Sequence, residues 1–238
     1  MHKPNVIFAG VEAAEQFDYR QASHPCLVQT CNGGTQMLDN EGTHFVVVHH
    51  GELTVVRPDG VATLRAGCFG TFPGEITLAG SAQYLVVSSL GYRGMALIGG
   101  PIEQHGRLRY VDNCTNTILL PPPVKGEPCL NFLRLPRHTA QTPHTHPSLR
   151  VGMVVSGVGI CETQAGDLPM RSGTIFIIEP EAVHSFQSCD DDMRIVIYHP
   201  DSDSGPTHED HTMLNRTFID GVAARTLTHL HTKEGVSA

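Results

Sequence analysis

The chain has 238 residues, of which 40% are hydrophobic and 17% charged, and its formal net charge is −8 at pH 7. This negative balance argues against binding to nucleic-acid phosphates or to anionic membrane surfaces. No apolar run reaches the roughly 18 residues that a membrane-spanning helix needs. Residues 1–10 turn polar too early for a signal peptide, so we expect a cytoplasmic location. The seven cysteines are scattered without a CxxC pair, which is typical of reduced thiols.

Short runs of β-branched, aliphatic and aromatic residues recur between glycines and prolines along the chain. In chain order, the predicted strands cover residues 45–48, 53–56, 84–88, 117–120, 131–135, 151–155, 174–178 and 194–198. Helical periodicity is weak, and we expect only short helices near residues 11–17 and 215–230. Many short strands with frequent turns predict an all-β sandwich or barrel.

The two halves of the chain repeat each other at a shift of 106 residues. Three glycines of the first half then fall on glycines of the second half: Gly51 on Gly157, Gly60 on Gly166 and Gly67 on Gly173. Turn glycines hold backbone conformations that other residues adopt only with strain, so their register is informative. We infer two tandem β units that meet near the proline run 121–123, which gives domains 1–120 and 121–238.

Two histidines, His144 and His146, precede an apolar run that ends at Gly157. In an extended strand, residues i and i+2 point to the same face, so both imidazoles can be directed at one point. Two neutral imidazoles form half of a transition-metal site. A third histidine, His184, lies downstream, and the prediction of a metal centre depends on whether the three residues meet.

The spacing around the histidine pair resembles the first motif of the cupins, which runs His-x-His, three or four residues, Glu, six residues, Gly. Here His144 and His146 are followed after three residues by Arg150 and after six more by Gly157. The sequence His-Thr-His-Pro is similar to the germin version. The resemblance implies a small antiparallel jelly-roll barrel, with histidines near its mouth that bind Fe, Mn, Ni, Zn or Cu.

The second cupin motif runs Gly, five residues, Pro-x-Gly, two residues, His. The interval from Gly173 to His184 fits this spacing but lacks the proline and glycine. In the first half, Leu38, Asn40 and Leu78 stand where the second half has its histidines. The chain therefore resembles a bicupin, with two tandem jelly-roll barrels, a degenerate first barrel and an equipped second barrel. The resemblance also implies a homodimer.

Arg150 replaces the usual cupin carboxylate, and arginine cannot ligate a metal because it stays protonated. In one interpretation, three neutral histidines hold the metal and Arg150 binds a substrate carboxylate or phosphate bidentately beside it. The resemblance supports this interpretation, because several cupin thiol and diketone dioxygenases lack the carboxylate. In a second interpretation, a cation near the metal marks a decayed site. In a third, the histidines are hydrogen-bonded core groups.

Other polar residues lie close to the histidine segment in sequence. His138 is a candidate acid or base, and the candidates for substrate binding besides Arg150 are Gln141, Asn131, Arg134 and Tyr198. By strand alternation, only one of Asn131 and Arg134 should face inward. The same holds for Tyr198 and His199.

The function we favour is that of a mononuclear metal enzyme acting on a small anionic substrate that carries a carboxylate. The resemblance points to a three-histidine Fe(II) dioxygenase, with Zn, Mn, Ni and Cu as alternative metals. A metal-dependent isomerase, lyase or hydrolase fits the same residues. The alternative from another class is a non-catalytic bicupin that binds a small ligand. The sequence predicts neither a nucleic-acid nor a membrane partner.

Overall fold

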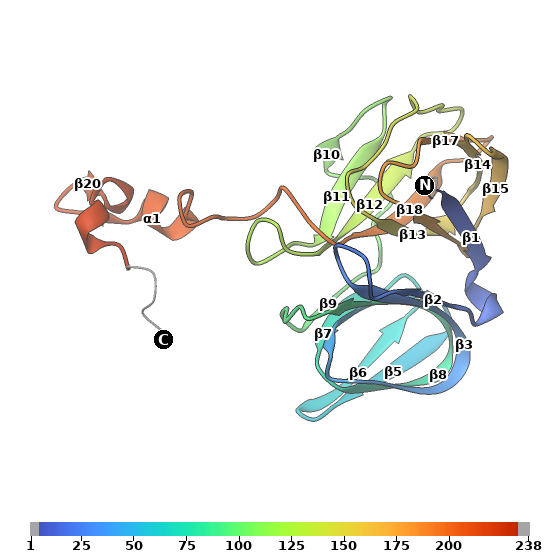
Figure 1. The fold of residues 1–238 in the computed structure, drawn as a ribbon, viewed down its shortest axis with the longest axis horizontal. Helices are drawn as coiled ribbons and strands as arrows, with labels where there is room; N and C mark the ends of the chain where they lie inside the picture. The colour runs from blue at the N-terminus through green and yellow to red at the C-terminus, as the bar shows by residue number, and fades with distance from the viewer. Residues whose placement is uncertain (1–4, 233–238) are drawn as a thin grey trace.

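The computed structural model describes residues 5–232, which form two β-barrels and an arm that carries the chain away from them (Figure 1). The first barrel consists of β2 (Gln16–Tyr19), β3 (Cys26–Leu38), β4 (Gly42–His50), β5 (Glu52–Arg57), β6 (Gly60–Arg65), β7 (Phe69–Pro73), β8 (Ile76–Leu90) and β9 (Leu97–Gly99). Its strand order is β2-β3-β8-β4-β7-β9, with the β5–β6 hairpin attached to β8.

The second barrel combines a large sheet and a small one. The large sheet has the order β1-β16-β13-β18-β12-β11-β10 and contains β1 (Val6–Gly10), β10 (Leu108–Arg109), β11 (Thr115–Leu120), β12 (Cys129–Leu135), β13 (Arg150–Ser156), β16 (Thr174–Ile178) and β18 (Met193–His199). The small sheet has the order β15-β14-β17 and contains β14 (Val158–Thr163), β15 (Gly166–Arg171) and β17 (His184–Ser188). The predicted all-β class is confirmed, and each predicted strand lies within one of these elements.

Two of the three repeated glycine pairs have closely matching backbone conformations in the two barrels. Gly51 and Gly157 have φ values of +78° and +89°, and Gly67 and Gly173 have +79° and +87°. These left-handed values favour glycine because it lacks a Cβ. The sequence register of the glycines therefore corresponds to equivalent turns in two similar barrels.

Strand pairing divides the chain differently from the predicted boundary at residue 120. Strand β1 pairs with β16 of the second barrel, where Val6 lies opposite Ile178. Strands β10 and β11 also join the second barrel, through pairing of β11 with β12. The proline run predicts a domain boundary at this point. However, a strand can pair with any complementary sheet edge that it reaches, whatever its place in the chain. Residues 6–10 and 108–120 thus belong to the second barrel by their hydrogen bonds.

Hydrophobic residues form one core inside each barrel and a third core between the barrels. The third core includes Phe45 and Val87 of the first barrel together with Val151 and Tyr198 of the second. Side chains alternate along β13, so Val151 faces the other barrel while Val154 packs inside its own. The two barrels therefore share a continuous apolar interface.

Two regions predicted as helical contain only short helical turns, interrupted by strands. Residues 11–17 contain a 3-10 turn, η1 (Val11–Ala13), followed by β2. The C-terminal arm contains α1 (Thr212–Arg216), the hairpin of β19 (Phe218–Ile219) and β20 (Val222–Ala223), and the 3-10 turns η2 (Ala224–Thr226) and η3 (Thr228–Leu230). The turn at Asp220 and Gly221 has positive φ at both residues, which favours a hairpin over a helix.

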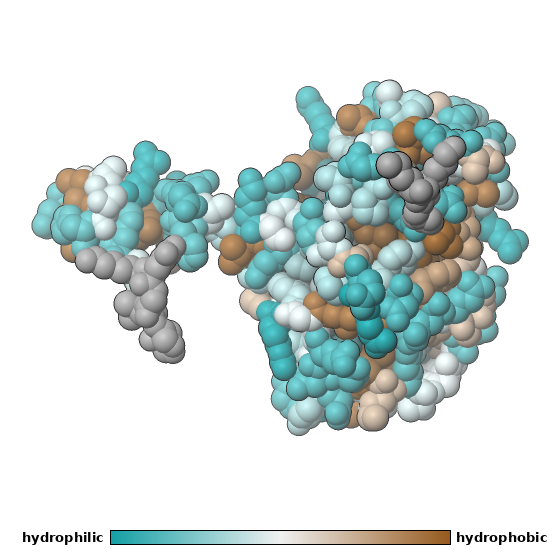
Figure 2. All heavy atoms as spheres, viewed as in Figure 1, coloured by the Kyte–Doolittle hydropathy of each residue, from teal (hydrophilic) through white to brown (hydrophobic). Residues whose placement is uncertain are grey.

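The surface seen in Figure 2 is largely hydrophilic, with scattered hydrophobic residues on the barrels and on the arm. Within residues 5–232, no helix is long and apolar enough to cross a membrane.

Candidate metal centre

His144 and His184 face each other across a backbone bridge near the mouth of the second barrel. The N–H of His144 donates to the carbonyl of His184 (2.9 Å), and the N–H of His184 donates to the carbonyl of His144 (3.0 Å). This antiparallel pairing holds the two ring centroids 4.6 Å apart. The segment before β13 and the start of β17 therefore bring together two histidines that are 40 residues apart in the sequence.

His146 completes the cluster from the same side of its segment as His144. Its ring centroid lies 5.1 Å from those of both His144 and His184. One nitrogen from each ring can be chosen so that all three lie within 4.8 Å of one another. The i, i+2 spacing of the pair thus places both imidazoles on one point together with His184, as the sequence pattern predicted.

Backbone carbonyls fix the tautomer of two of these histidines. Nδ1 of His144 donates to the carbonyl of Thr142 (2.8 Å), and Nδ1 of His184 donates to the carbonyl of Ala182 (2.9 Å). A carbonyl can only accept, so each Nδ1 carries the hydrogen and each Nε2 keeps its lone pair. Nε2 of His184 is buried and has no hydrogen-bond partner within the described structure.

The environment keeps two of the cluster imidazoles neutral at physiological pH. Burial, followed by the neighbouring Arg150 and the other two histidines, lowers the pKa of His146 to about 3. Burial also lowers the pKa of His184 to about 4, against the effect of its hydrogen bond to Ala182. A metal binds the neutral form of imidazole, so no proton has to be displaced from these two residues near pH 7.

These features fit a divalent transition metal. The cluster offers three nitrogen donors without a carboxylate, one buried lone pair has no partner, and carbonyls orient two of the rings. Orientation of metal-binding histidines by such outer hydrogen bonds is the usual arrangement. Three imidazoles leave coordination positions free, and they suit Fe, Ni, Zn and Cu alike.

Arg150, the first residue of β13, is buried beside the histidines. Its Nη1 contacts the Ser148 hydroxyl, the Leu149 carbonyl (3.0 Å) and Oδ1 of Asp201 (3.3 Å). Its Nε is buried and has no hydrogen-bond partner within residues 5–232. The expected bidentate binding of an anion by Arg150 cannot use Nη1, because Asp201 and its neighbours engage that nitrogen. Nε is left unengaged.

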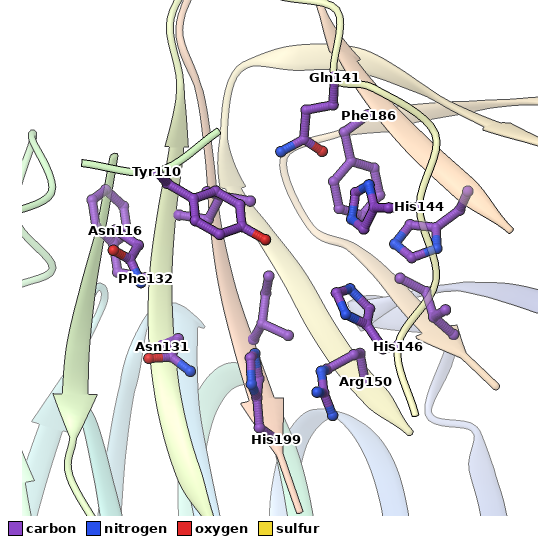
Figure 3. A pocket seen from close by; sticks show the side chains of 14 residues that line it. Tyr110, Asn116, Asn131, Phe132, Gln141, His144, His146, Arg150, Phe186 and His199 are labelled. Carbon is purple, nitrogen blue, oxygen red and sulfur yellow. The ribbon is translucent and has the colours of Figure 1, made fainter. Parts of the chain in front are cut away.

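Arg150 and the three histidines line one cavity, which encloses about 540 Å³ of empty space including its mouth (Figure 3). Much of its wall is apolar and comes from Phe132, Leu133, Ile178, Phe186 and Ile197. The polar lining besides the histidine cluster consists of Tyr110, Asn116, Asn131, Gln141, Arg150 and His199. An apolar chamber with a few polar groups is the usual form of a small-molecule site.

The structure places only some of the predicted substrate-binding residues at this cavity. Asn131 and Gln141 line it. Arg134 does not line it, because alternation on β12 turns its side chain away from the barrel interior. On that outer side, its Nη2 lies 2.6 Å from Oδ2 of Asp192. His138 is exposed in a turn at φ +58° and does not line the cavity, so its predicted role as acid or base has no support here.

Tyr198 is also absent from the cavity, and its neighbour His199 takes the expected place. The Tyr198 ring lies in the core between the barrels, 4.9 Å from the ring of Phe45. His199 is next in β18 and points to the opposite face, into the cavity (Figure 3). Burial, then Arg150 and His146, lowers the pKa of His199 well below its ordinary value. This imidazole is therefore neutral at pH 7.

Sequence reasoning missed three contributors to the site and left a fourth, His199, open as the alternative to Tyr198. Tyr110 and Asn116 come from the β10–β11 hairpin, which the predicted boundary assigned to the first domain. Asp201 lies just after β18, beyond the last predicted strand, and contacts Arg150. Strand alternation limits that choice to Tyr198 or His199 but does not decide it. For the other three, no sequence signal was available, because only the tertiary structure brings Tyr110 and Asn116 to the cavity and Asp201 to Arg150.

The equivalent point in the first barrel is filled and carries no such ligand set. Leu38 and Leu78, at the positions of His144 and His184, are buried in the core of that barrel. His44, at the position of Arg150, bonds through Nδ1 to the Ser88 hydroxyl (2.8 Å), and its Nε2 donates to the carbonyls of Asp39 and Gly74. Burial lowers the pKa of His44. Its role in the first barrel is structural.

Known proteins with similar folds agree with this architecture. The family model of the AraC-like ligand binding domain matches residues 126–202. A cupin 2 conserved barrel domain protein from Leptotrichia buccalis superposes with a TM-score of 0.57 at 9% identity, covering 82% of this chain and 88% of that chain. A salicylate 1,2-dioxygenase from Pseudaminobacter salicylatoxidans has a TM-score of 0.57 at 10% identity, with 74% and 70% covered.

An oxalate decarboxylase deletion variant from Bacillus subtilis is also similar, with a TM-score of 0.53 at 10% identity and 85% and 78% of the chains covered. No curated protein sequence matches the chain. At these identities the likeness concerns the fold alone. The chain thus has the cupin-type fold, as two tandem jelly-roll barrels of which the second holds a three-histidine group.

Proposed function

We propose that the second barrel is the active site of a mononuclear metal enzyme that acts on a small carboxylate-bearing substrate, with Fe(II) as the metal and dioxygen as co-substrate. The observation that carries the proposal is the convergence of His144, His146 and His184 on one point beside the buried Nε of Arg150. The dioxygenase part draws support from the fold, which is shared with the salicylate 1,2-dioxygenase.

In this proposal each residue has a distinct task. The three histidines hold the metal, which when bound supplies Lewis acidity and access to dioxygen chemistry. Arg150 binds the substrate anion through Nε, while Asp201 and Ser148 engage Nη1 and hold the guanidinium against the rim. The apolar wall, which includes Ile178 and Phe186, excludes water from the substrate and strengthens the attraction between Arg150 and an anion.

The charges around the cavity favour an anionic substrate. Asp201 offsets the charge of Arg150, and two of the cluster histidines are neutral near pH 7. A divalent metal in this neutral donor set keeps its two positive charges. An incoming carboxylate is therefore attracted both by the metal and by the free edge of Arg150.

Metal analysis of the purified protein tests the core of the proposal. We expect about one transition-metal ion per chain, and its loss in His144→Ala and His184→Ala but not in the control His208→Ala, which changes an exposed loop histidine. Oxygen uptake by iron-loaded protein is then measured with a panel of small carboxylates. Absence of bound metal, together with unchanged ligand binding in His144→Ala, would contradict the enzyme proposal.

A non-catalytic ligand-binding module is the second candidate, favoured by the match of residues 126–202 to the AraC-like ligand binding domain. A metal-dependent isomerase, lyase or hydrolase remains the alternative within the enzyme class. Ligands from the panel that bind without being consumed, with or without oxygen, support the binding module. Conversion of a ligand without oxygen uptake supports the non-oxidative enzyme.

A further inference from the structure

Besides Nε2 of His184, two further buried polar atoms without partners belong to residues that line the histidine cavity. One is Oε1 of Gln141, a residue only 4% exposed, and the other is Nε of Arg150, in a residue 8% exposed. Leaving a buried polar atom unpaired costs about 1–3 kcal/mol, so such atoms call for an explanation. Both residues line the cavity, and no group within the described residues pairs with either atom.

The two atoms have opposite hydrogen-bonding character. Nε of Arg150 can only donate, and Oε1 of Gln141 can only accept. The orientation of the Gln141 amide follows from its Nε2, which donates to Sγ of Cys114 (3.6 Å). The backbone N–H of Gln141 donates to the carbonyl of Phe186 (3.0 Å), so the loop that carries the side chain is tied to β17.

Gln141 and Arg150 lie at opposite ends of the site. Figure 3 shows the imidazoles of His144 and His146 between them along the cavity wall. The wall near this line is apolar and includes Ile178 and Phe186. A ligand that spans the cavity therefore meets a donor at one end, the histidine cluster in the middle and an acceptor at the other end.

From this arrangement we propose that the substrate is bifunctional: a carboxylate bound at Arg150, a short apolar body across the histidine cluster, and a hydroxyl or other hydrogen-bond donor received by Oε1 of Gln141. This inference rests on the proposed function and specifies its substrate class. Gln141 is then a specificity-determining residue. A site built to accept a hydrogen bond discriminates strongly against an analogue that lacks the donor, because its own polar atom is left unpaired.

The test measures binding by calorimetry to zinc-loaded protein, because zinc does not support oxidation and the probes stay intact. The probes are straight-chain alkanoates of increasing length, with their ω-hydroxy and ω-methoxy counterparts. At the length that spans the cavity, we expect the ω-hydroxy acid to bind about tenfold tighter than the plain alkanoate and the ω-methoxy acid. This preference should disappear in the near-isosteric variant Gln141→Met, while affinity for plain alkanoates stays within about threefold of wild type.

The inference is overturned if the ω-methoxy acid binds as tightly as the ω-hydroxy acid, or if the preference survives in Gln141→Met. Either result shows that Gln141 does not receive a donor. The same titrations on metal-free protein separate this result from failure of the proposed function. Loss of metal uptake with a retained hydroxyl preference overturns the enzyme proposal and leaves the ligand class standing.

Discussion

Arg150 and the three histidines form a site in which a buried cation lies beside a group of neutral nitrogen donors. Asp201 engages one nitrogen of the guanidinium, which offsets its charge without occupying Nε. Nε of Arg150 and Nε2 of His184 are buried and unpaired, which costs stability unless a ligand or metal pairs with them. This cost argues against a decayed site. The balance of charges around the metal position is therefore the property to test at the residue scale.

Replacing Arg150 by methionine should change metal and anion binding in opposite directions. Removal of the cation lessens repulsion of a divalent ion at the histidines, so zinc affinity should rise several-fold. Affinity for a simple carboxylate should fall at least tenfold, because the charge-assisted hydrogen bond is lost. Competitive chelator titration and calorimetry measure the two effects. Equal carboxylate affinity in both proteins would remove Arg150 from the binding site.

His44 predicts a pH dependence of stability in the first barrel. Burial lowers its pKa in the folded chain, so the unfolded chain binds more protons below about pH 6.5 and stability falls as the pH decreases. The contribution of one histidine reaches about 1.4 kcal/mol per pH unit. Urea unfolding of metal-free protein at several pH values should give a shallower dependence for His44→Gln than for wild type. Identical slopes would contradict the assignment.

At the scale of the elements, the tight turns between strands define the barrel that holds the site. Gly157 joins β13 to β14 at φ +89°, and an added Cβ would lie 2.3 Å from the carbonyl oxygen of Asp192. Gly126 has a similar φ of +95°, with nothing within 4 Å of the same position. Alanine substitutions at the two glycines therefore distinguish the effect of backbone strain from that of a steric clash.

Gly157→Ala should destabilise the protein well beyond Gly126→Ala. The control carries only the left-handed strain of about 1–2 kcal/mol, whereas Gly157→Ala adds a collision with backbone that cannot move freely. We expect a difference of about 2 kcal/mol or more in the free energy of unfolding, measured with urea. Equal losses would show that the turn before β14 can relax.

At the scale of the whole molecule, the two barrels share an apolar core that contains Phe45 of the first and Tyr198 of the second. The first barrel lacks the ligand set, yet it covers the outer face of the sheet from which Arg150 and His199 project on the other side. The first barrel therefore packs against the back of the sheet that carries the site.

Phe45→Ala should lower the stability of the metal-binding barrel although the residue lies outside it. Loss of a buried phenylalanine side chain costs about 3–5 kcal/mol. Because the core is continuous, unfolding should remain a single transition. Far-UV circular dichroism and the release of bound zinc should report the same shift of its midpoint. An exposed-site variant, Met37→Ala, serves as the control, since Met37 is 72% exposed. Two separate transitions would show that the barrels unfold independently.

Local sequence determined the strands, the repeat and the histidine pair, because these depend on periodicity, on left-handed glycine turns and on the i, i+2 rule. It also placed Arg150 correctly on the inner face of its strand. Only the tertiary structure assigned β1 and the β10–β11 hairpin to the second barrel and paired Arg150 with Asp201. It likewise determined that His199, and not Tyr198, lines the cavity, because this depends on which face of β18 meets the other barrel. Pairing between distant strands and the packing of two sheets depend on the whole chain, and no local pattern encodes them.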